Sequence, residues 1–466
     1  MYNVVLAVTG PLFAAFLVIA LSVGLDKLLL GGSLVDKLKL AANAGSIDVI
    51  LVWLAIGLAI VLAIALVASF YVNINRFSLH ALYRNRLIRA YLGASRQERH
   101  PDLFTGFDAD DNIRMHELWP PRPAADGANS RSLFHVINIA LNVVATKRKA
   151  WQQRKAEPFT VSPLHCGTSY LGFRTSDEYG DSIRTQAGQG ITLGTAVAIS
   201  GAAVSSNMGY HSSPSITLLL TLFNVRLGWW LGNPGKWGDK RNAYRREGPD
   251  FAAKPLFDEA FGQTTDHSPY VYLSDGGHFE NLGLYEMVRR RCRFIIVVDA
   301  GCEPKFGFED LGNAVRKIYI DLGVAIEFEG LERLQNRPSA KVIRRETAKG
   351  PIPYCAIGTI DYKNADGPEC ENGFIIYIKP AYHDANESAG IRSYAKANPT
   401  FPHESTVDQW FTESQFESYR SLGMEIAQDV LNNDVDAWPI VSEFLAKRRG
   451  PQSSSPRSIT PTAEWA

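Results

Sequence analysis

Two long apolar stretches near the start of the chain constrain its fold more than any other feature. Residues 4–25 (VVLAVTGPLFAAFLVIALSVGL) and 49–72 (VILVWLAIGLAIVLAIALVASFYV) contain no charged side chain. As α-helices they would be about 33 and 36 Å long, whereas the hydrocarbon core of a bilayer is about 30 Å thick. We therefore predict a transmembrane helical hairpin within residues 1–75. Two helices buried in a soluble core are the competing interpretation.

The segment after the second stretch is strongly basic. Between residues 76 and 99 a single acidic residue, Glu98, stands against six arginines: Arg76, Arg84, Arg86, Arg89, Arg96 and Arg99. Loops rich in Lys and Arg stay on the cytoplasmic side of a membrane. We therefore expect a membrane protein with two spans, whose globular part, residues 76–448, lies on the cytoplasmic side. Membrane lipids are its expected partners, since juxtamembrane arginines contact anionic headgroups.

The composition argues against several classes of protein. The 48 Lys and Arg balance the 48 Asp and Glu, so no overall field attracts nucleic acid and we expect no such partner. The five cysteines are scattered and form no C-x-x-C pair, which predicts neither a disulfide framework nor a zinc site. We expect no metal and no organic cofactor. Residues 449–466 are rich in Ser and Pro, and this composition predicts a disordered tail.

Residues 270–302 (YVYLSDGGHFENLGLYEMVRRRCRFIIVVDAGC) predict an α/β domain. The run FIIVV at 294–298 is short, β-branched and apolar, which is typical of a strand buried on both faces. Residues 271–273 and 374–378 predict two further strands. Between the predicted strands 271–273 and 294–298, apolar residues recur at helical spacing over 279–292. The pattern therefore predicts a βαβ unit.

Asp275 is the residue of this stretch most suited to chemistry. It lies one residue beyond a predicted strand, and ligands of open α/β sheets bind at the carboxyl ends of strands. Gly276 and Gly277 have no Cβ and let a substrate or another backbone come close. A carboxylate held there can accept a proton from a serine hydroxyl as a general base. The alternative is that Asp275 only caps the next helix or forms an Asx turn. His278 and Asp299 are weaker candidates for the same edge.

Three blocks of sequence resemble the patatin-like and cytosolic phospholipase A2-like acyl hydrolases, in particular bacterial membrane-anchored members. They are LSDGGHFENLGLYEMVRRRCRFIIVVDAG (273–301), LGTAVAISGAAVSSNMGYHSSP (193–214) and FPHESTVDQWFTESQFESYRSLG (401–423). The resemblance covers roughly residues 76–447. It implies a three-layer α/β domain, here its acid-bearing C-terminal portion, and lipid acyl hydrolysis by a Ser/Asp dyad without histidine. Within it, Asp275 matches the dyad aspartate.

The nucleophile of that dyad is harder to place. No serine of the chain stands in G-x-S-x-G, and the single Ser-Gly dipeptide is Ser200-Gly201 within AISGAAV. The small and apolar neighbours of Ser200 favour a tightly packed helix, so Ser200 is a weak candidate nucleophile. We expect the serine to lie in a preceding segment or in a partner chain. The competing hypothesis is an inactive, membrane-tethered binding or scaffold protein with an inherited hydrolase fold.

Overall fold

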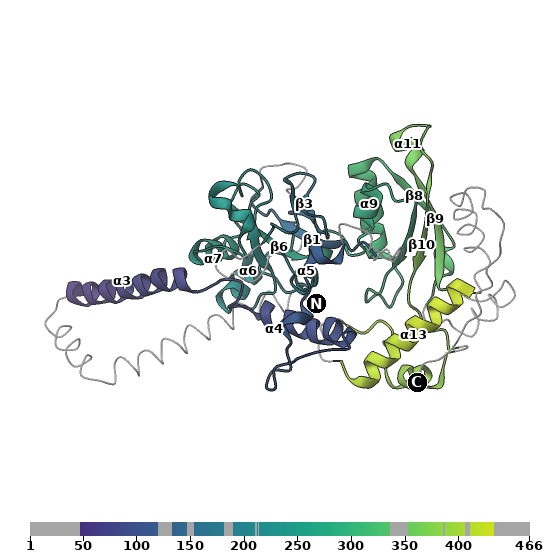
Figure 1. The fold of residues 1–466 in the computed structure, drawn as a ribbon, viewed down its shortest axis with the longest axis horizontal. Helices are drawn as coiled ribbons and strands as arrows, with labels where there is room; N and C mark the ends of the chain where they lie inside the picture. The colour runs from purple at the N-terminus through teal and green to yellow at the C-terminus, as the bar shows by residue number, and fades with distance from the viewer. Residues whose placement is uncertain are drawn as a thin grey trace. The chain divides into compact units, whose positions relative to one another are not determined.

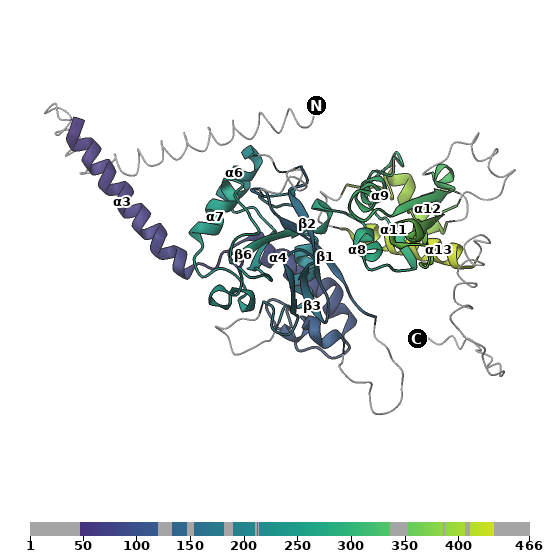
Figure 2. The same cartoon turned by 90° about the horizontal axis from the view of Figure 1, so that it is seen from above.

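The computed structural model describes residues 47–119, 133–146, 153–180, 190–209, 212, 214–335, 353–384, 387–405 and 411–432. The first predicted span and the predicted disordered tail lie outside these residues. The chain divides into two compact units, residues 1–283 (unit 1) and 284–466 (unit 2). Figures 1 and 2 show the elements of both units.

A single long helix, α3 (Ile47–Tyr71), forms where the second membrane span was predicted. Its side chains are described at residue 55 and from residue 57 on, and the apolar ones there are largely exposed on consecutive positions around the helix. Among the residues whose side chains the structure describes, which in α3 are residue 55 and residues 57–71, no helix is long and apolar enough to cross a membrane.

Unit 1 is built on an antiparallel six-stranded sheet with the strand order β4-β3-β2-β1-β6-β5. Its strands are β1 (Ile137–Asn142), β2 (Ala156–Val161), β3 (His165–Thr168), β4 (Gly172–Thr175), β5 (Trp229–Gly232) and β6 (Tyr270–Asp275). Strand β6 lies between β1 and β5, and its last residue, Asp275, pairs with Ile139 of β1. The end of β6 is therefore held by a central strand of the sheet.

Side chains alternate across this sheet, as the pleat requires. Leu231 and Leu273 point into the main core, together with Phe159 and Ile199. Trp230 and Tyr272 point to the opposite face, where they pack with Ile74 and Ala252. Both faces of the β5-β6 pair are thus covered.

The helices of unit 1 are mostly short. Besides α3 they are α4 (Leu79–Leu87), α5 (Leu193–Ser200), α6 (Pro214–Leu222) and α7 (Ala253–Ala260), with the π-helix η1 (Ile88–Leu92) and the 3-10 turns η2 (Gly93–Ser95), η3 (Ala109–Asp111), η4 (Met115–Leu118), η7 (Lys240–Arg245) and η8 (Gly276–His278). Helix α5 packs against β1, β6 and η8. Its hydroxyl-bearing last residue, Ser200, therefore lies beside the end of β6.

Unit 2 contains a four-stranded mixed sheet with the order β7-β10-β9-β8. The strands are β7 (Phe294–Val298), β8 (Ala325–Glu329), β9 (Cys355–Asp361) and β10 (Gly373–Ile378), and only β7 and β10 run parallel. The helical elements are α8 (Leu284–Arg289), α9 (Glu309–Leu322), η9 (Leu331–Arg333), α11 (Tyr362–Asp366), α12 (Ala389–Ala397) and α13 (Glu413–Asn432). The core of unit 2 joins Ile376 of β10 to Ile391 of α12 and Ile426 of α13.

The mixed α/β class is confirmed, but the predicted βαβ unit over residues 270–302 is wrong. Strand β6 pairs in the antiparallel sheet of unit 1, and β7 pairs in the sheet of unit 2. The helix between them is short, because η8 and the turn after it use residues 276–283. Strand β7 is also not buried on both faces, since Ile296 and Val298 are exposed. Local sequence patterns predicted the strands but not their partners.

Candidate functional site

The carboxylate of Asp275 is fixed by the turn that follows it. Asp275 ends β6, and its Oδ1 accepts a hydrogen bond of 2.7 Å from the backbone N–H of Gly277. This is the Asx-type capping geometry that the sequence offered as an alternative. The bond uses one oxygen and leaves the other without a hydrogen bond among the described residues.

The two glycines after Asp275 are required by close approaches of the chain. A Cβ on Gly276 would lie 2.7 Å from the backbone oxygen of Asn138. A Cβ on Gly277 would lie 2.6 Å from Oδ1 of Asn281 and 3.1 Å from Oδ1 of Asp275 itself. The predicted close approach is therefore real, and it brings β1 and the turn against the carboxylate.

Burial is the main influence on the protonation of Asp275. It raises the pKa of this carboxyl from 3.8 to about 6, and the hydrogen bond from Gly277 opposes the rise only in part. No Lys or Arg of the described residues forms an ion pair with Asp275. A buried carboxylate with a raised pKa and no cationic partner is a candidate for proton transfer.

Tyr83 of α4 is a member of this site that the sequence did not reveal. Its pKa is raised by burial and further by the charge of Asp275. Its hydroxyl lies where a Cβ on Gly201 would come within 2.4 Å, so the glycine after Ser200 makes room for the phenol. Tyr83 stood among the arginines of a segment that we interpreted as juxtamembrane, and no local pattern marked it.

Ser200 lies at the same end of the sheet as Asp275. Its Oγ donates a 2.7 Å hydrogen bond to the backbone oxygen of Asn138, the atom that also faces Gly276. The structure thus brings Ser200 and the turn after Asp275 to one carbonyl group, with Tyr83 beside Gly201. The proton of Ser200 is directed to this carbonyl rather than to the carboxylate.

His278 takes part in a neighbouring network. Its Nδ1 lies 2.7 Å from Oγ of Ser274, which also accepts a 2.7 Å hydrogen bond from Nδ2 of Asn142. Ser274 is fully buried, so these contacts stabilise the turn after β6 and do not present a nucleophile to a substrate. These contacts favour a structural role for His278 over a role in the candidate site.

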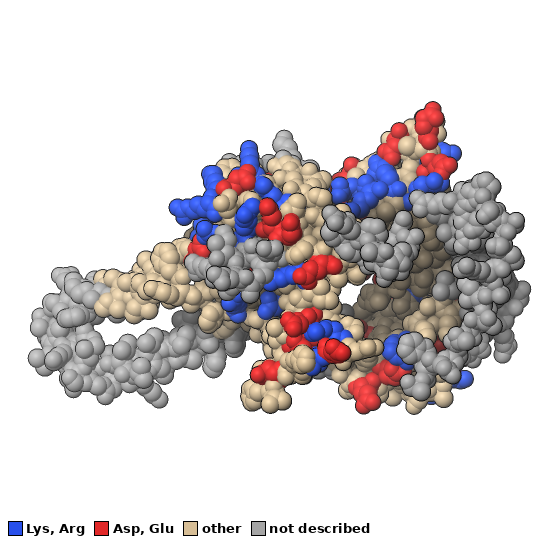
Figure 3. All heavy atoms as spheres, viewed as in Figure 1, with Lys and Arg blue, Asp and Glu red and all other residues tan. Residues whose placement is uncertain are grey.

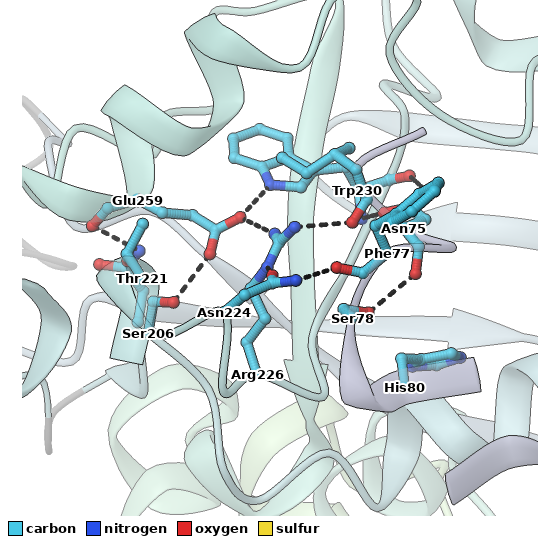
Figure 4. A network of polar contacts seen from close by, with 12 residues as sticks. Asn75, Phe77, Ser78, His80, Ser206, Thr221, Asn224, Arg226, Trp230 and Glu259 are labelled. Carbon is cyan, nitrogen blue, oxygen red and sulfur yellow. Dashed lines mark hydrogen bonds and ion pairs between the residues drawn. The ribbon is translucent and has the colours of Figure 1, made fainter. Parts of the chain in front are cut away.

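A second buried network lies on the opposite face of the same sheet, shown in Figure 4. Glu259 is fully buried and accepts hydrogen bonds from Trp230 Nε1 (2.6 Å) and Ser206 Oγ (2.8 Å). It also pairs with Arg226, whose Nη2 donates to the backbone oxygen of Ile74 at 2.6 Å. Both carboxylate oxygens of Glu259 accept hydrogen bonds, so this acid has a structural role. Together with Arg226 it connects the segment after α3 to β5.

Asp299 does not share an edge with Asp275, contrary to the sequence interpretation. It lies in unit 2, just beyond the parallel strands β7 and β10. Its Oδ2 is 3.0 Å from Nζ of the buried Lys379 and accepts a 2.5 Å hydrogen bond from Tyr377. Lys379 also pairs with Glu303 at 3.1 Å. The charge of Asp299 is therefore compensated inside unit 2.

Other site types find no support among the described residues. No group of three or more His, Cys, Asp or Glu there is arranged to hold a metal ion. On the face drawn in Figure 3, basic and acidic side chains are interspersed and α3 shows none of either. No family model matches the chain, and no curated protein is detectably similar to it.

Proposed function

We propose that the chain is a membrane-anchored lipid acyl hydrolase in which Asp275 is the general base of a Ser/Asp dyad. The observation that carries the proposal is the carboxyl of Asp275, with its pKa raised to about 6 and no ion pair among the described residues. Such a group is mostly ionised at pH 7 and still basic enough to accept a proton. The resemblance of residues 193–214 and 273–301 to patatin-like hydrolases supports the same role.

The proposed chemistry is an acyl transfer. Asp275 takes the proton of a serine hydroxyl as the serine oxygen attacks the ester carbonyl carbon, and the protonated carboxyl then returns that proton to the departing alkoxide. Water repeats these steps on the acyl-enzyme and releases the fatty acid. Burial keeps Tyr83 protonated, so its hydroxyl is available as a hydrogen-bond donor beside the carboxylate.

The serine itself is proposed to come from another segment or another polypeptide. Among the described residues, Ser200 lies beside the site, but its hydroxyl donates to Asn138. The chain has no G-x-S-x-G sequence, the motif that presents the nucleophile in the family that it resembles. The expected partner is therefore a domain that carries a serine at a strand-to-helix turn.

The membrane part of the proposal rests on α3 and on the first apolar stretch. Helix α3 is 25 residues long and apolar on all sides, with Asp48 as its one charged residue. A helix that is apolar all round is buried either in a protein core or in a bilayer. Since the described apolar side chains of α3 are exposed, we propose the bilayer. The basic segment after α3 then supports a cytoplasmic position for the rest of unit 1, and the proposed substrates are the acyl esters of membrane lipids.

The test measures hydrolysis of a short-chain p-nitrophenyl ester by cell membranes that contain the protein. Asp275→Asn is expected to lower the protein-dependent rate about 10²- to 10⁴-fold, the usual contribution of a general base. The matched control is Asp239→Asn, since Asp239 is an exposed carboxylate of unit 1 that pairs with Arg174. Activity of the unchanged protein should rise with pH through about 6, as Asp275 ionises.

A fluorophosphonate probe added to the same membranes identifies the nucleophile. Labelling of a second polypeptide that disappears in Asp275→Asn supports a serine supplied from elsewhere. Labelling at Ser200 would overturn that part of the proposal and leave the role of Asp275 intact. Equal rates for the unchanged protein and Asp275→Asn, without any label, would favour the alternative, a membrane-tethered binding or scaffold protein. The bond between Ser200 and Asn138 is the observation that keeps this alternative open.

A further inference from the structure

The C-terminal end of α3 is bonded directly to the segment that leads into α7. The backbone N–H of Ala252 donates to the oxygen of Ser69, in the last turn of α3, at 2.9 Å. The rings of Phe70 and Phe251 are in contact, with centroids 4.8 Å apart. Figures 1 and 2 both show α7 beside the end of α3. The start of α7 is thus at the same level as the last turn of α3.

The junction between α3 and the rest of unit 1 is held by several hydrogen bonds. Asn75, four residues beyond α3, donates to the backbone oxygens of Trp230 (2.8 Å) and Glu247 (2.9 Å) and accepts from the Trp230 N–H (2.9 Å). Arg226 holds the neighbouring oxygen of Ile74. The position of α7 relative to the end of α3 is therefore fixed by several buried hydrogen bonds rather than by a flexible linker.

Large apolar side chains are exposed around this junction. Phe257 and Phe261, on α7 and at its C-terminal end, are 55% and 60% exposed, and their tilted rings are in contact with centroids 4.4 Å apart. Phe77 is 63% exposed, and its backbone oxygen accepts a hydrogen bond from Asn224, beside the exposed Phe223 at the end of α6. Helices α6 and α7 pack on each other. We refer to Phe77, Phe223, Phe257 and Phe261 as the aromatic collar.

Cations flank the collar. Lys254, on the first turn of α7, keeps 63% of its side chain exposed beside Asp258, and Arg76 keeps 59% of its side chain exposed beside Glu247. Exposed apolar rings together with exposed basic side chains are the combination that binds the boundary between headgroups and acyl chains.

We propose that the aromatic collar is a second membrane contact, which inserts into the interface of the bilayer that α3 enters. This inference rests on the membrane anchoring proposed above. Helix α3 has 25 residues, about 37 Å of helix against about 30 Å of hydrocarbon. Its last turn therefore lies in the headgroup layer, and so does the segment bonded to Ser69. Interfacial helices bury their apolar face about 5–10 Å into this layer.

The occupant of the collar is the lipid bilayer because of this continuity. Helix α3, which begins the described part of unit 1 and ends at the collar, brings a bilayer to it, whereas no contact of the described residues brings a protein partner there. The consequence for function is orientation. Two attachments, α3 and the collar, fix the tilt of unit 1 and hence the direction from which a lipid reaches Asp275.

The experiment uses the full protein in vesicles of phosphatidylcholine and phosphatidylglycerol whose acyl chains carry an alkyne tag. A photoreactive phenylalanine analogue replaces Phe257, and in separate samples it replaces Leu62 of α3 or Phe173 of β4. Phe173 is 41% exposed and lies on the edge strand farthest from β5. After irradiation, lipid attached to the protein is measured through the tag.

The expected result is lipid attachment at 257 similar to that at 62 and at least about tenfold above that at 173, as for a side chain buried in the interface. Attachment at 62 with none at 257 would overturn the collar and leave the anchor standing. No attachment at 62 would overturn the membrane anchoring, and the collar with it. Equal attachment at 257 and 173 would also overturn the collar, because lipid capture would then be unspecific.

Discussion

The turns that follow β6 and β7 begin in the same way. In each, an aspartate at the end of a strand accepts a hydrogen bond from the backbone N–H two residues later: Gly277 donates to Asp275 at 2.7 Å, and Gly301 donates to Asp299 at 2.9 Å. In each, a Cβ on that glycine would crowd the aspartate, at 3.1 and 3.0 Å from its Oδ1. The local chemistry of the two turns is the same.

Their surroundings differ. Asp299 contacts the ammonium of Lys379 and the hydroxyl of Tyr377. Tyr377 lies near the end of the neighbouring parallel strand β10, and Lys379 follows that strand directly. Asp275 is buried without a counter-ion among the described residues, and its pKa is raised to about 6. Burial with a partner makes a carboxylate a structural element, whereas burial without one makes it a candidate base. The same motif thus has two roles, and the partner side chains decide between them.

Removal of the cation beside Asp299 should produce the largest effect. Lys379→Met keeps the length of the side chain but leaves the carboxylates of Asp299 and Glu303 uncompensated. Loss of one partner of a buried pair costs about 3–5 kcal/mol. Hydrogen exchange of peptides from β7 and β10 should show this loss of local stability.

The matched control for Lys379→Met is Lys305→Met, in the exposed loop after Asp299. This change should alter exchange by less than about 0.5 kcal/mol, as surface substitutions do. If both variants exchange alike, the ion pair does not stabilise unit 2 and the contrast with Asp275 loses its physical basis.

Asp275→Asn is expected to raise the free energy of unfolding, whereas Lys379→Met lowers it. The folded carboxyl keeps its proton up to about pH 6, while in the unfolded chain it loses the proton near 3.8. Stability therefore falls as pH rises from about 3.8 to 6, and the cost of about 3 kcal/mol is fully present above pH 6. The amide still accepts from Gly277, so the variant should be more stable than the unchanged protein at pH 8 and nearly equal to it at pH 4.

Thermal unfolding at the two pH values measures this difference, with Asp239→Asn as the exposed control. A variant that is less stable at pH 8 would mean that the carboxylate has a stabilising partner. In that case Asp275 would resemble Asp299, and the argument for a base would fail.

The smallest of the three effects is expected for Tyr377→Phe. This change removes the hydrogen bond from the hydroxyl to Asp299 and keeps the ring contacts with Phe308 and Phe328. A hydrogen bond to a charged group contributes about 2 kcal/mol, so the loss should fall below that of Lys379→Met. Hydrogen exchange in residues 299–308 is the readout, and a loss as large as that of Lys379→Met would show that the hydroxyl rather than the ion pair holds Asp299.

Much of the local structure could be predicted from the sequence. Apolar runs indicated strands that the structure forms at β6, β7 and β10, and the small residues around Ser200 indicated a packed helix, which is α5. The pattern D-G-G indicated a tight turn with a close backbone, and Asn138 supplies that backbone. These features follow from neighbouring residues, so the sequence contains the information directly.

The sheet to which each strand belongs could not be predicted from neighbouring residues. Strands β6 and β7 are close in sequence but belong to different sheets, because β6 pairs with β1 and β5, whereas β7 pairs with β10. Tyr83 could not be found either, since its approach to Gly201 and Asp275 depends on how α4 packs on α5.

The sequence by itself determined where the carboxylates of Asp275 and Asp299 stand, because a strand followed by small residues places an aspartate at a strand end. It also determined the apolar character of α3, because every residue of this helix after Asp48 is uncharged. Only the tertiary structure decided that Asp299 meets Lys379 and that Asp275 meets no cation among the described residues. The reason is physical: burial and charge compensation depend on side chains that come from distant parts of the chain.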